Sequence, residues 1–190
     1  MDVTSVTTHV GGWARTRPWV GVLARVVLAG VFLIAGGTKV GDLAASGRAV
    51  DAYQLMPFSV ATAVGAALPF IEIAIGLLLL IGLATRLAGA LSAALLTVFI
   101  AGIASVWARG LSIDCGCFGT GGQLAEGQSP QYGWEIARDV ALLALAVFLV
   151  AYPRTPLSVD AYVLGDVEAD REQQGEEQAS QPGGTRATSA

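Results

Sequence analysis

The chain has 190 residues, of which 54% are hydrophobic and 14% are charged, against about 25% charged residues in an ordinary soluble domain. A water-soluble domain of this length could hardly cover itself with so little polar surface, so the composition predicts an integral membrane protein. The net charge of −4 is concentrated in the C-terminal residues, and no basic stripe is interleaved with aromatic side chains, which excludes nucleic acid as a partner.

Four apolar stretches are long enough to cross a bilayer, because about 20 helical residues span about 30 Å of hydrocarbon. They cover residues 18–40, 60–84, 87–108 and 134–152. The expected fold class is therefore all-α, an integral membrane bundle of four transmembrane helices in contact with the lipid bilayer. A cleaved secretory signal is the alternative for the first stretch, but such a leader would be longer than about 40 residues and would contain the acidic Asp2.

The first stretch also sets the expected orientation, which follows the distribution of Lys and Arg in the short flanks. Arg15 and Arg17 precede this stretch, and Arg25 can extend back toward them, whereas Lys39 stands at its other end. We therefore expect a multi-pass protein of the plasma (inner) membrane with both termini in the cytoplasm.

The connections between the stretches differ in length. Residues 82–86 form a tight turn, which makes the second and third helices antiparallel neighbours. Residues 41–58 form a longer connection, in which residues 48–53 are expected to be an interfacial helix that ends before Pro57. Residues 109–133 form a Gly-rich loop that carries both cysteines, and by the orientation above this loop is extracytoplasmic.

The chain divides into a membrane domain of residues 18–153 and two tails. Residues 1–17 form the cytoplasmic N-terminal tail. Residues 154–190 are rich in Gln, Gly, Ser and Ala, and from Ser158 onward they include seven acidic and two basic residues. Such a segment buries too little apolar surface to offset the entropy of ordering it, so it is expected to be disordered.

The motif Asp114-Cys115-Gly116-Cys117-Phe118-Gly119 concentrates the chemistry of the chain. Two thiols separated by one residue can close a disulfide only as a small ring, and Gly116 supplies the backbone freedom that such a ring needs. The ring is strained, and strain makes a disulfide easier to reduce. The spacing therefore favours reversible dithiol exchange by Cys115 and Cys117 over a permanent cross-link.

Two other interpretations of the cysteines stay open. Both can be reduced and packed as small hydrophobic side chains. A closed zinc site needs ligands beyond two thiolates, and the sole histidine, His9, lies on the opposite side of the membrane in this orientation. No metal site within one chain is therefore expected, whereas a site shared between two chains remains open.

Charged side chains inside the predicted membrane segments form a second group of candidates. Such residues are costly in lipid, so they normally face the bundle interior and pair with one another. Glu72 lies near the middle of the second stretch, Lys39 ends the first, and Arg138 and Asp139 lie about one turn into the fourth. If these stretches converge, Glu72 can pair with Lys39 or with Arg138. This intramembrane charge network either locks the bundle, supports proton or electron exchange near the cysteines, or pairs locally, as Glu135 and Arg138 can at i,i+3.

The cysteine motif, on an outer loop between a third and a fourth membrane helix, resembles that of the MauE family of methylamine-utilisation proteins, within the DoxX-like four-helix membrane proteins. The resemblance covers about residues 18–153. Its other parts are Gly36-Gly37-Thr38-Lys39, Tyr53-Gln54-Leu55-Met56-Pro57, Pro69-Phe70-Ile71-Glu72 followed by Gly76, and Trp134 with Arg138-Asp139.

This resemblance implies a function in the disulfide-dependent maturation of an exported protein, beside a thioredoxin-like partner. No residue of the chain points to methylamine itself. The sequence also contains no recognisable quinone signature, so it names no cofactor.

Three functions follow, in order of preference. The first is a membrane thiol–disulfide relay, a component of a thiol–disulfide oxidoreductase system, in which Cys115 and Cys117 exchange electrons with an exported partner. The second is a non-enzymatic assembly factor whose cysteines clamp or dock an exported client. The third is a small-solute transporter, which Glu72 alone supports.

Overall fold

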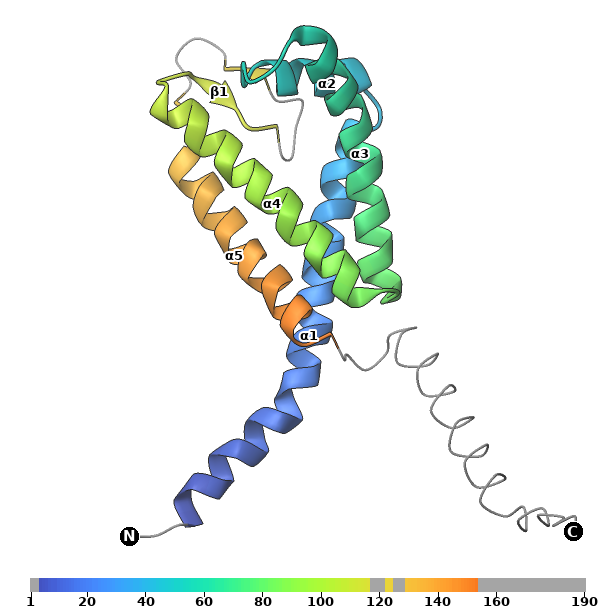
Figure 1. Cartoon of the computed structure of the whole chain (residues 1–190), viewed down its shortest axis with the longest axis vertical. Helices are drawn as coiled ribbons and strands as arrows, with labels where there is room; N and C mark the ends of the chain where they lie inside the picture. The colour runs from blue at the N-terminus through green and yellow to red at the C-terminus, as the bar shows by residue number, and fades with distance from the viewer. Residues whose placement is uncertain (1–3, 117–121, 125–128, 154–190) are drawn as a thin grey trace, which may run out of the picture.

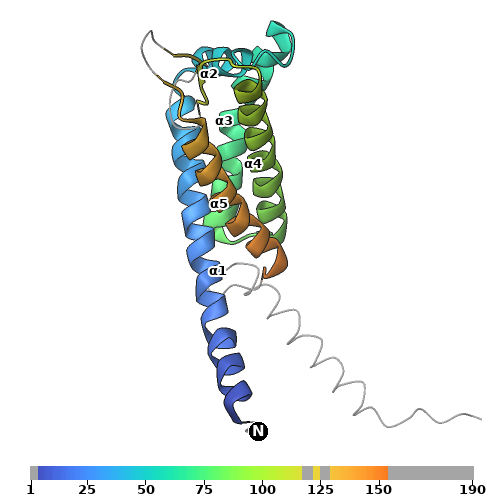
Figure 2. The same ribbon diagram turned by 90° about the vertical axis from the view of Figure 1, so that its left-hand side faces the viewer.

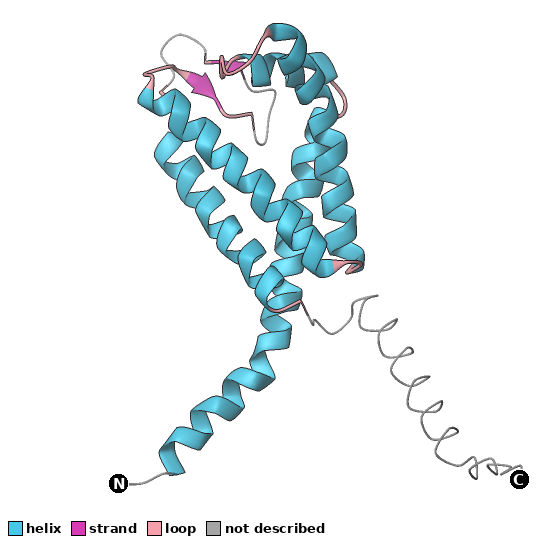
Figure 3. Cartoon of the chain, viewed as in Figure 1, coloured by secondary structure: helices cyan, strands magenta, loops and turns pink. Residues whose placement is uncertain are grey.

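The computed structural model describes residues 4–116, 122–124 and 129–153, with side chains from residue 16 onward apart from that of Gln123. Cys117 and the tail of residues 154–190 lie outside the described residues. The described elements are helices joined by short connections and one two-stranded sheet (Figure 3), in the order α1 (Thr4–Lys39), α2 (Leu43–Asp51), α3 (Phe58–Ile81), α4 (Thr85–Ala108), β1 (Ile113–Asp114), β2 (Gly122–Gln123) and α5 (Tyr132–Ala151).

The four long helices run side by side, and the short α2 lies across one end of the bundle together with β1 (Figure 1). At the other end, the N-terminal half of α1 extends well beyond the remaining helices (Figure 2). Helix α1 packs against α3 and α5, α4 packs against α5, and α2 packs against α3. The short elements therefore form a cap over one end of the bundle.

Three helical segments are long and apolar enough to cross a membrane, namely Thr16–Lys39, Phe58–Ile81 and Thr85–Ala108. Large apolar side chains remain exposed along them, among them Leu23, Phe70, Leu80 and Val98. A soluble monomer rarely exposes so much contiguous apolar surface, whereas lipid covers it at no cost. The structure thus confirms a helical membrane protein.

Helix α5 corresponds to the predicted fourth membrane segment. It is 20 residues long and packs against α1 and α4, but Glu135, Arg138 and Asp139 lie near its start, and it is not one of the three membrane-compatible helices. A fourth membrane crossing therefore remains a prediction.

The connections before and after α3 show one prediction confirmed and one corrected. The turn between α3 and α4 is tight, as predicted, and Gly82 adopts the left-handed conformation (φ 74°) while its N–H donates to the Leu78 carbonyl at 2.9 Å. The interfacial helix predicted for residues 48–53 instead begins at Leu43. It begins there because the Asp42 carboxylate accepts the Ala45 N–H at 2.8 Å and caps the helix.

Helices α1 and α3 approach each other so closely that glycine is required on both. A Cβ atom on Gly36 would lie 2.7 Å from the Pro69 carbonyl oxygen, and one on Gly76 would lie 2.8 Å from Cγ of Leu33. Small residues allow such backbone contact between membrane helices. Gly36 lies one turn before Lys39, so this contact also sets where the end of α1 meets α3.

The main core lies between α1, α3, α4 and α5 and includes Leu28, Phe32, Leu79, Leu96 and Leu149. Arg25 is also inside this bundle, with 4% of its surface exposed. The side of α1 that carries Arg25 therefore faces the neighbouring helices. The extension of its side chain toward Arg15 and Arg17 stays a prediction.

We predict that Gly36→Ala destabilises the protein, whereas Gly37→Ala does not. The added methyl at position 36 would overlap the backbone of α3, and overpacking typically costs about 1–3 kcal/mol. Gly37 has open space around it, so alanine there should be neutral or slightly stabilising through helix propensity. Thermal unfolding of the two purified variants in detergent checks this, and equal unfolding midpoints would contradict the close contact.

Candidate functional site

Two tyrosine hydroxyls hold the backbone of the cysteine loop. The Tyr132 hydroxyl donates to the Leu111 carbonyl at 2.6 Å and accepts the Ile113 N–H at 2.8 Å. The Tyr53 hydroxyl donates to the Cys115 carbonyl at 3.0 Å. The loop is thereby fixed on one side to α5 and on the other to the segment that follows α2.

A small apolar cluster supports the loop from below. Its members come from the end of α2, from α4, from β1 and from the start of α5, and they are Ala52, Ile103, Val106, Ile113 and Tyr132. Cys115 and Ile136 pack against this cluster. This cluster is separate from the main core and gives the loop a packed base at the capped end of the bundle.

Arg109 strengthens the same end of the bundle through backbone contacts. Its Nη2 donates to the Tyr53 carbonyl at 2.6 Å, and its Nε donates to the Ser105 carbonyl at 3.1 Å. The guanidinium therefore ties the end of α4 to the segment after α2, next to the tyrosine that holds Cys115.

The chain turns sharply at the first cysteine. The Asp114 carboxylate accepts the Gly116 N–H at 3.0 Å, and Gly116 adopts a left-handed conformation (φ 69°) that a residue with a side chain would strain to adopt. Strands β1 and β2 pair antiparallel, with Asp114 opposite Gly122. The described strands thus bracket residues 117–121, which lie outside the described residues, and the Cys115–Cys117 disulfide remains a prediction.

Glu135, a titratable neighbour of the Cys115 thiol, was not among the site residues predicted from the sequence. The Cys115 sulfur and carboxylate oxygens of Asp114 and Glu135 all lie within 4.8 Å of one another, near enough to share a metal ion. The Cys115 thiol therefore lies beside the Glu135 carboxylate, to which it can donate its hydrogen. Glu135 could have been predicted, because it is the acidic residue in the first turn of the helix that follows the cysteine motif.

The intramembrane ion pair that the sequence predicted as one of two options is formed between Lys39 and Glu72. The Lys39 ammonium lies 2.8 Å from Oε1 and 3.1 Å from Oε2 of Glu72, and the two residues are 7% and 1% exposed. The Phe99 ring of α4 lies 5.9 Å from the same ammonium. Glu72 therefore pairs with Lys39 and not with Arg138.

Arg138 and Asp139 form a second ion pair within α5. Nε of Arg138 lies 2.9 Å and Nη2 lies 2.8 Å from Oδ1 of Asp139, which is 2% exposed. The structure thus arranges the four predicted charges as two pairs, one between α1 and α3 and one inside α5.

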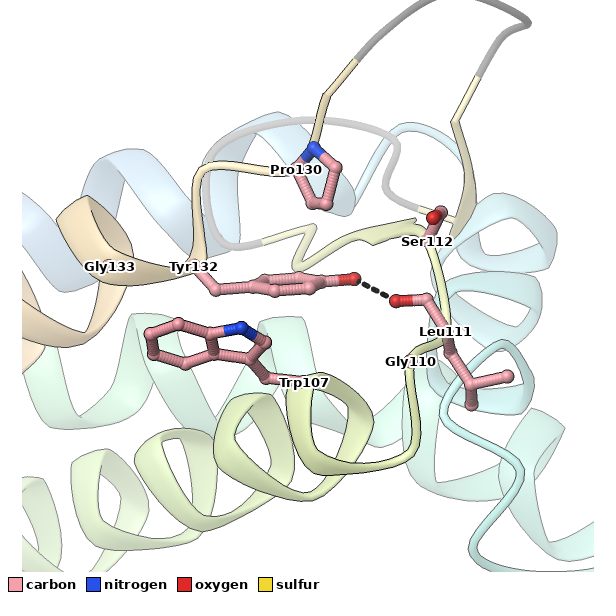
Figure 4. A pocket seen from close by; sticks show the side chains of 7 residues that line it. All are labelled: Trp107, Gly110, Leu111, Ser112, Pro130, Tyr132 and Gly133. Carbon is pink, nitrogen blue, oxygen red and sulfur yellow. Dashed lines mark hydrogen bonds between the residues drawn. The ribbon is translucent and has the colours of Figure 1, made fainter.

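A pocket of about 220 Å³ lies beside the cysteine loop (Figure 4). The Trp107 and Tyr132 rings lie against each other, with centroids 6.3 Å apart and an angle of 45° between their planes. Figure 4 shows Pro130 on the other side of the Tyr132 ring. None of the residues that line the pocket has a charged side chain. They are Trp107, Gly110, Leu111, Ser112, Pro130, Tyr132 and Gly133.

Comparison with known proteins gives one family. The family model described as methylamine utilisation protein MauE matches residues 17–152, well over half of the chain. The matched region contains α2 to α5, most of α1 and the cysteine loop. No curated protein and no solved structure matches the chain.

We predict that Glu72→Leu lowers both the amount of protein in the membrane and its unfolding midpoint in detergent. The substitution leaves the Lys39 ammonium buried without its partner, which typically costs about 3–5 kcal/mol. Glu72→Gln keeps the shape and one acceptor oxygen, so its loss should be smaller. The double variant Lys39→Met/Glu72→Leu should recover most of the stability, because it leaves no charge unpaired. If Glu72→Leu and Glu72→Gln both unfold at the wild-type midpoint, the ion pair has no structural role.

Proposed function

The chain belongs to the MauE family, and from that membership together with the geometry around Cys115 we propose that it is a membrane thiol–disulfide relay for the maturation of an exported protein. The family's description relates the maturation step to methylamine utilisation. The observation that carries the relay is the position of Cys115, whose carbonyl is held by Tyr53 and whose sulfur lies within 4.8 Å of the Glu135 carboxylate.

The relay requires two successive exchange steps. In the first, the thiolate of one cysteine attacks a disulfide of a thioredoxin-like exported partner, so that the partner's S–S bond breaks, a mixed disulfide forms and one partner sulfur leaves as a thiolate. In the second, the other cysteine attacks the mixed disulfide, which closes Cys115–Cys117 and releases the second partner thiol. The pair loses two electrons and the partner gains two, and the reverse sequence oxidises the partner.

We place the cysteine loop on the extracytoplasmic side of the plasma (inner) membrane, with α5 as the fourth transmembrane helix. The contact between Arg17 and Tyr152 supports this arrangement, because the guanidinium lies 4.2 Å from the ring centroid and joins the start of the apolar part of α1 to the end of α5. The cysteine loop and α2 lie at the opposite end of the bundle (Figure 2). Both termini then lie on the cytoplasmic side.

A non-enzymatic docking factor is the second candidate, and the pocket beside the loop favours it. A concave site lined by two aromatic rings and by polar backbone groups, with no charged side chain, suits an uncharged side chain of an exported client. In that function the cysteines would hold the client without transferring electrons.

The proposed orientation predicts that a membrane-impermeant maleimide, applied to intact cells after reduction, labels the protein. The chain has two cysteines, both in the proposed outer loop, so labelling reports on this loop alone. As a matched control, Arg86→Cys in a Cys115→Ser/Cys117→Ser background places a thiol in the α3–α4 turn. That thiol should react only after the membrane is permeabilised, and the opposite pattern would invert the orientation.

The relay predicts a trapped intermediate. Because each exchange passes through a mixed disulfide, replacing the cysteine that resolves it should leave a covalent adduct with the exported partner, whereas replacing the attacking cysteine should not. Cys115→Ser and Cys117→Ser are compared on non-reducing gels for a reducible species of higher mass. If neither traps a partner and the double variant still matures its client, the docking function replaces the relay.

A further inference from the structure

The carboxylate beside Cys115 suggests a specific task in this exchange. Resting on the proposed relay, we propose that Cys115 is the attacking sulfur and that Glu135 takes up its proton and returns it to the departing sulfur of the partner. Glu135 is then a catalytic residue, because it contacts the reacting thiol.

The contacts of Glu135 fit a proton acceptor. Its carboxylate lies within 4.8 Å of the Cys115 sulfur, and its Oε2 atom is shielded from solvent with no hydrogen-bond partner among the described residues. The residue belongs to the first turn of α5, so its backbone is held by a helix, while Tyr53 holds the Cys115 carbonyl from the other side. The thiol and the carboxylate are therefore fixed relative to each other by separate elements.

Asp114, the other carboxylate near this sulfur, already has a structural task. Its Oδ1 accepts the Gly116 N–H and shapes the turn, and the residue is exposed on β1. Arg138 and Asp139, the other charged neighbours that act on Glu135, are paired with each other one turn further along α5. Glu135 is thus the carboxylate that is positioned for proton exchange with the thiol.

The proton balances within each step. The Cys115 thiol gives its proton to the Glu135 carboxylate as its sulfur attacks the partner disulfide. The partner's S–S bond breaks, the Cys115–partner bond forms, and the departing thiolate takes the proton from Glu135, which returns to a carboxylate. No further oxidant or reductant is needed, because the partner disulfide accepts the electron pair.

This mechanism predicts that the importance of Glu135 depends on the leaving group. Full-length Cys117→Ser protein in detergent, which retains Cys115 alone, is reacted with hydroxyethyl disulfide and with dithiobis(nitrobenzoate). An aliphatic thiolate is the poorer leaving group, because its thiol has the higher pKa, so its departure depends more on the return of a proton than that of an aromatic thiolate. Adding Glu135→Gln should slow exchange with the aliphatic disulfide on the order of 10²- to 10⁴-fold, the usual range for losing an acid–base group, and should slow exchange with the aromatic one, which loses only the proton acceptor, at least tenfold less.

An equal loss with both disulfides, or no loss with either, would overturn the assignment, since a purely structural effect does not depend on the leaving group. Matched elution profiles and unfolding midpoints verify that Glu135→Gln folds. Glu135→Asp, which keeps a carboxylate at a greater distance, should give an intermediate ratio of the two rates and serves if the Gln variant does not fold.

Two matched comparisons locate the proton acceptor and the sulfur. Asp114→Asn should leave the ratio of the two rates as it is in the Cys117→Ser parent, and a shift in that ratio equal to that of Glu135→Gln would assign the proton transfer to Asp114. In Cys115→Ser protein, Glu135→Gln should not alter the reactivity of Cys117. A loss of reactivity there that depends on the leaving group would show that Glu135 serves Cys117, and the assignment of Cys115 as the attacking sulfur would be wrong. Failure of the proposed relay is recognised in a different experiment, in which neither single cysteine variant forms an adduct with a partner in cells.

Discussion

The ion pair between Lys39 and Glu72 is the interaction on which the arrangement of the helices depends. Both side chains are almost completely buried in an apolar bundle, where an unpaired charge is very costly. Helices α1 and α3 can therefore pack stably only in the register that joins these two groups. Gly36 makes this register possible, because without a side chain it allows the backbone of α1 to reach that of α3 at Pro69.

The same register determines where the cysteine loop lies. The carbonyl of Lys39 accepts the Asp42 N–H at 3.1 Å, so the end of α1 leads directly into the cap of α2. Helix α2 then crosses α3, where a Cβ on Gly47 would lie 3.1 Å from Cα of Thr62. Tyr53 follows α2 and holds the Cys115 carbonyl. A continuous set of contacts thus connects an ion pair inside the bundle with the reactive thiol at its end.

Much of this could be predicted from the sequence, and the remainder depended on contacts between distant residues. The apolar stretches gave α3, α4 and α5 and the end of α1 within a few residues, and Gly82 marked the turn after α3, because length and glycine are local signals. Helix α1 begins at Thr4, well before the apolar stretch that predicted it, because its first turns contain many polar residues. The start of α2 was missed because Asp42 was not read as a cap. The choice of Lys39 over Arg138 as the partner of Glu72, and the proximity of Cys115 to Glu135, depend on how helices pack, which no spacing within one segment reveals.

The sign of the charge beside the Cys115 thiol determines how readily the thiolate forms. A cation next to a cysteine would hold it as a thiolate and favour attack. In this protein Arg109, a cation near the loop, donates to two backbone carbonyls, and the Cys115 thiol instead lies beside a carboxylate. A carboxylate does not stabilise the thiolate by charge, but it can accept the proton during attack and return it when the sulfur departs. The same proton exchange would serve the proposed relay in both the oxidising and the reducing direction.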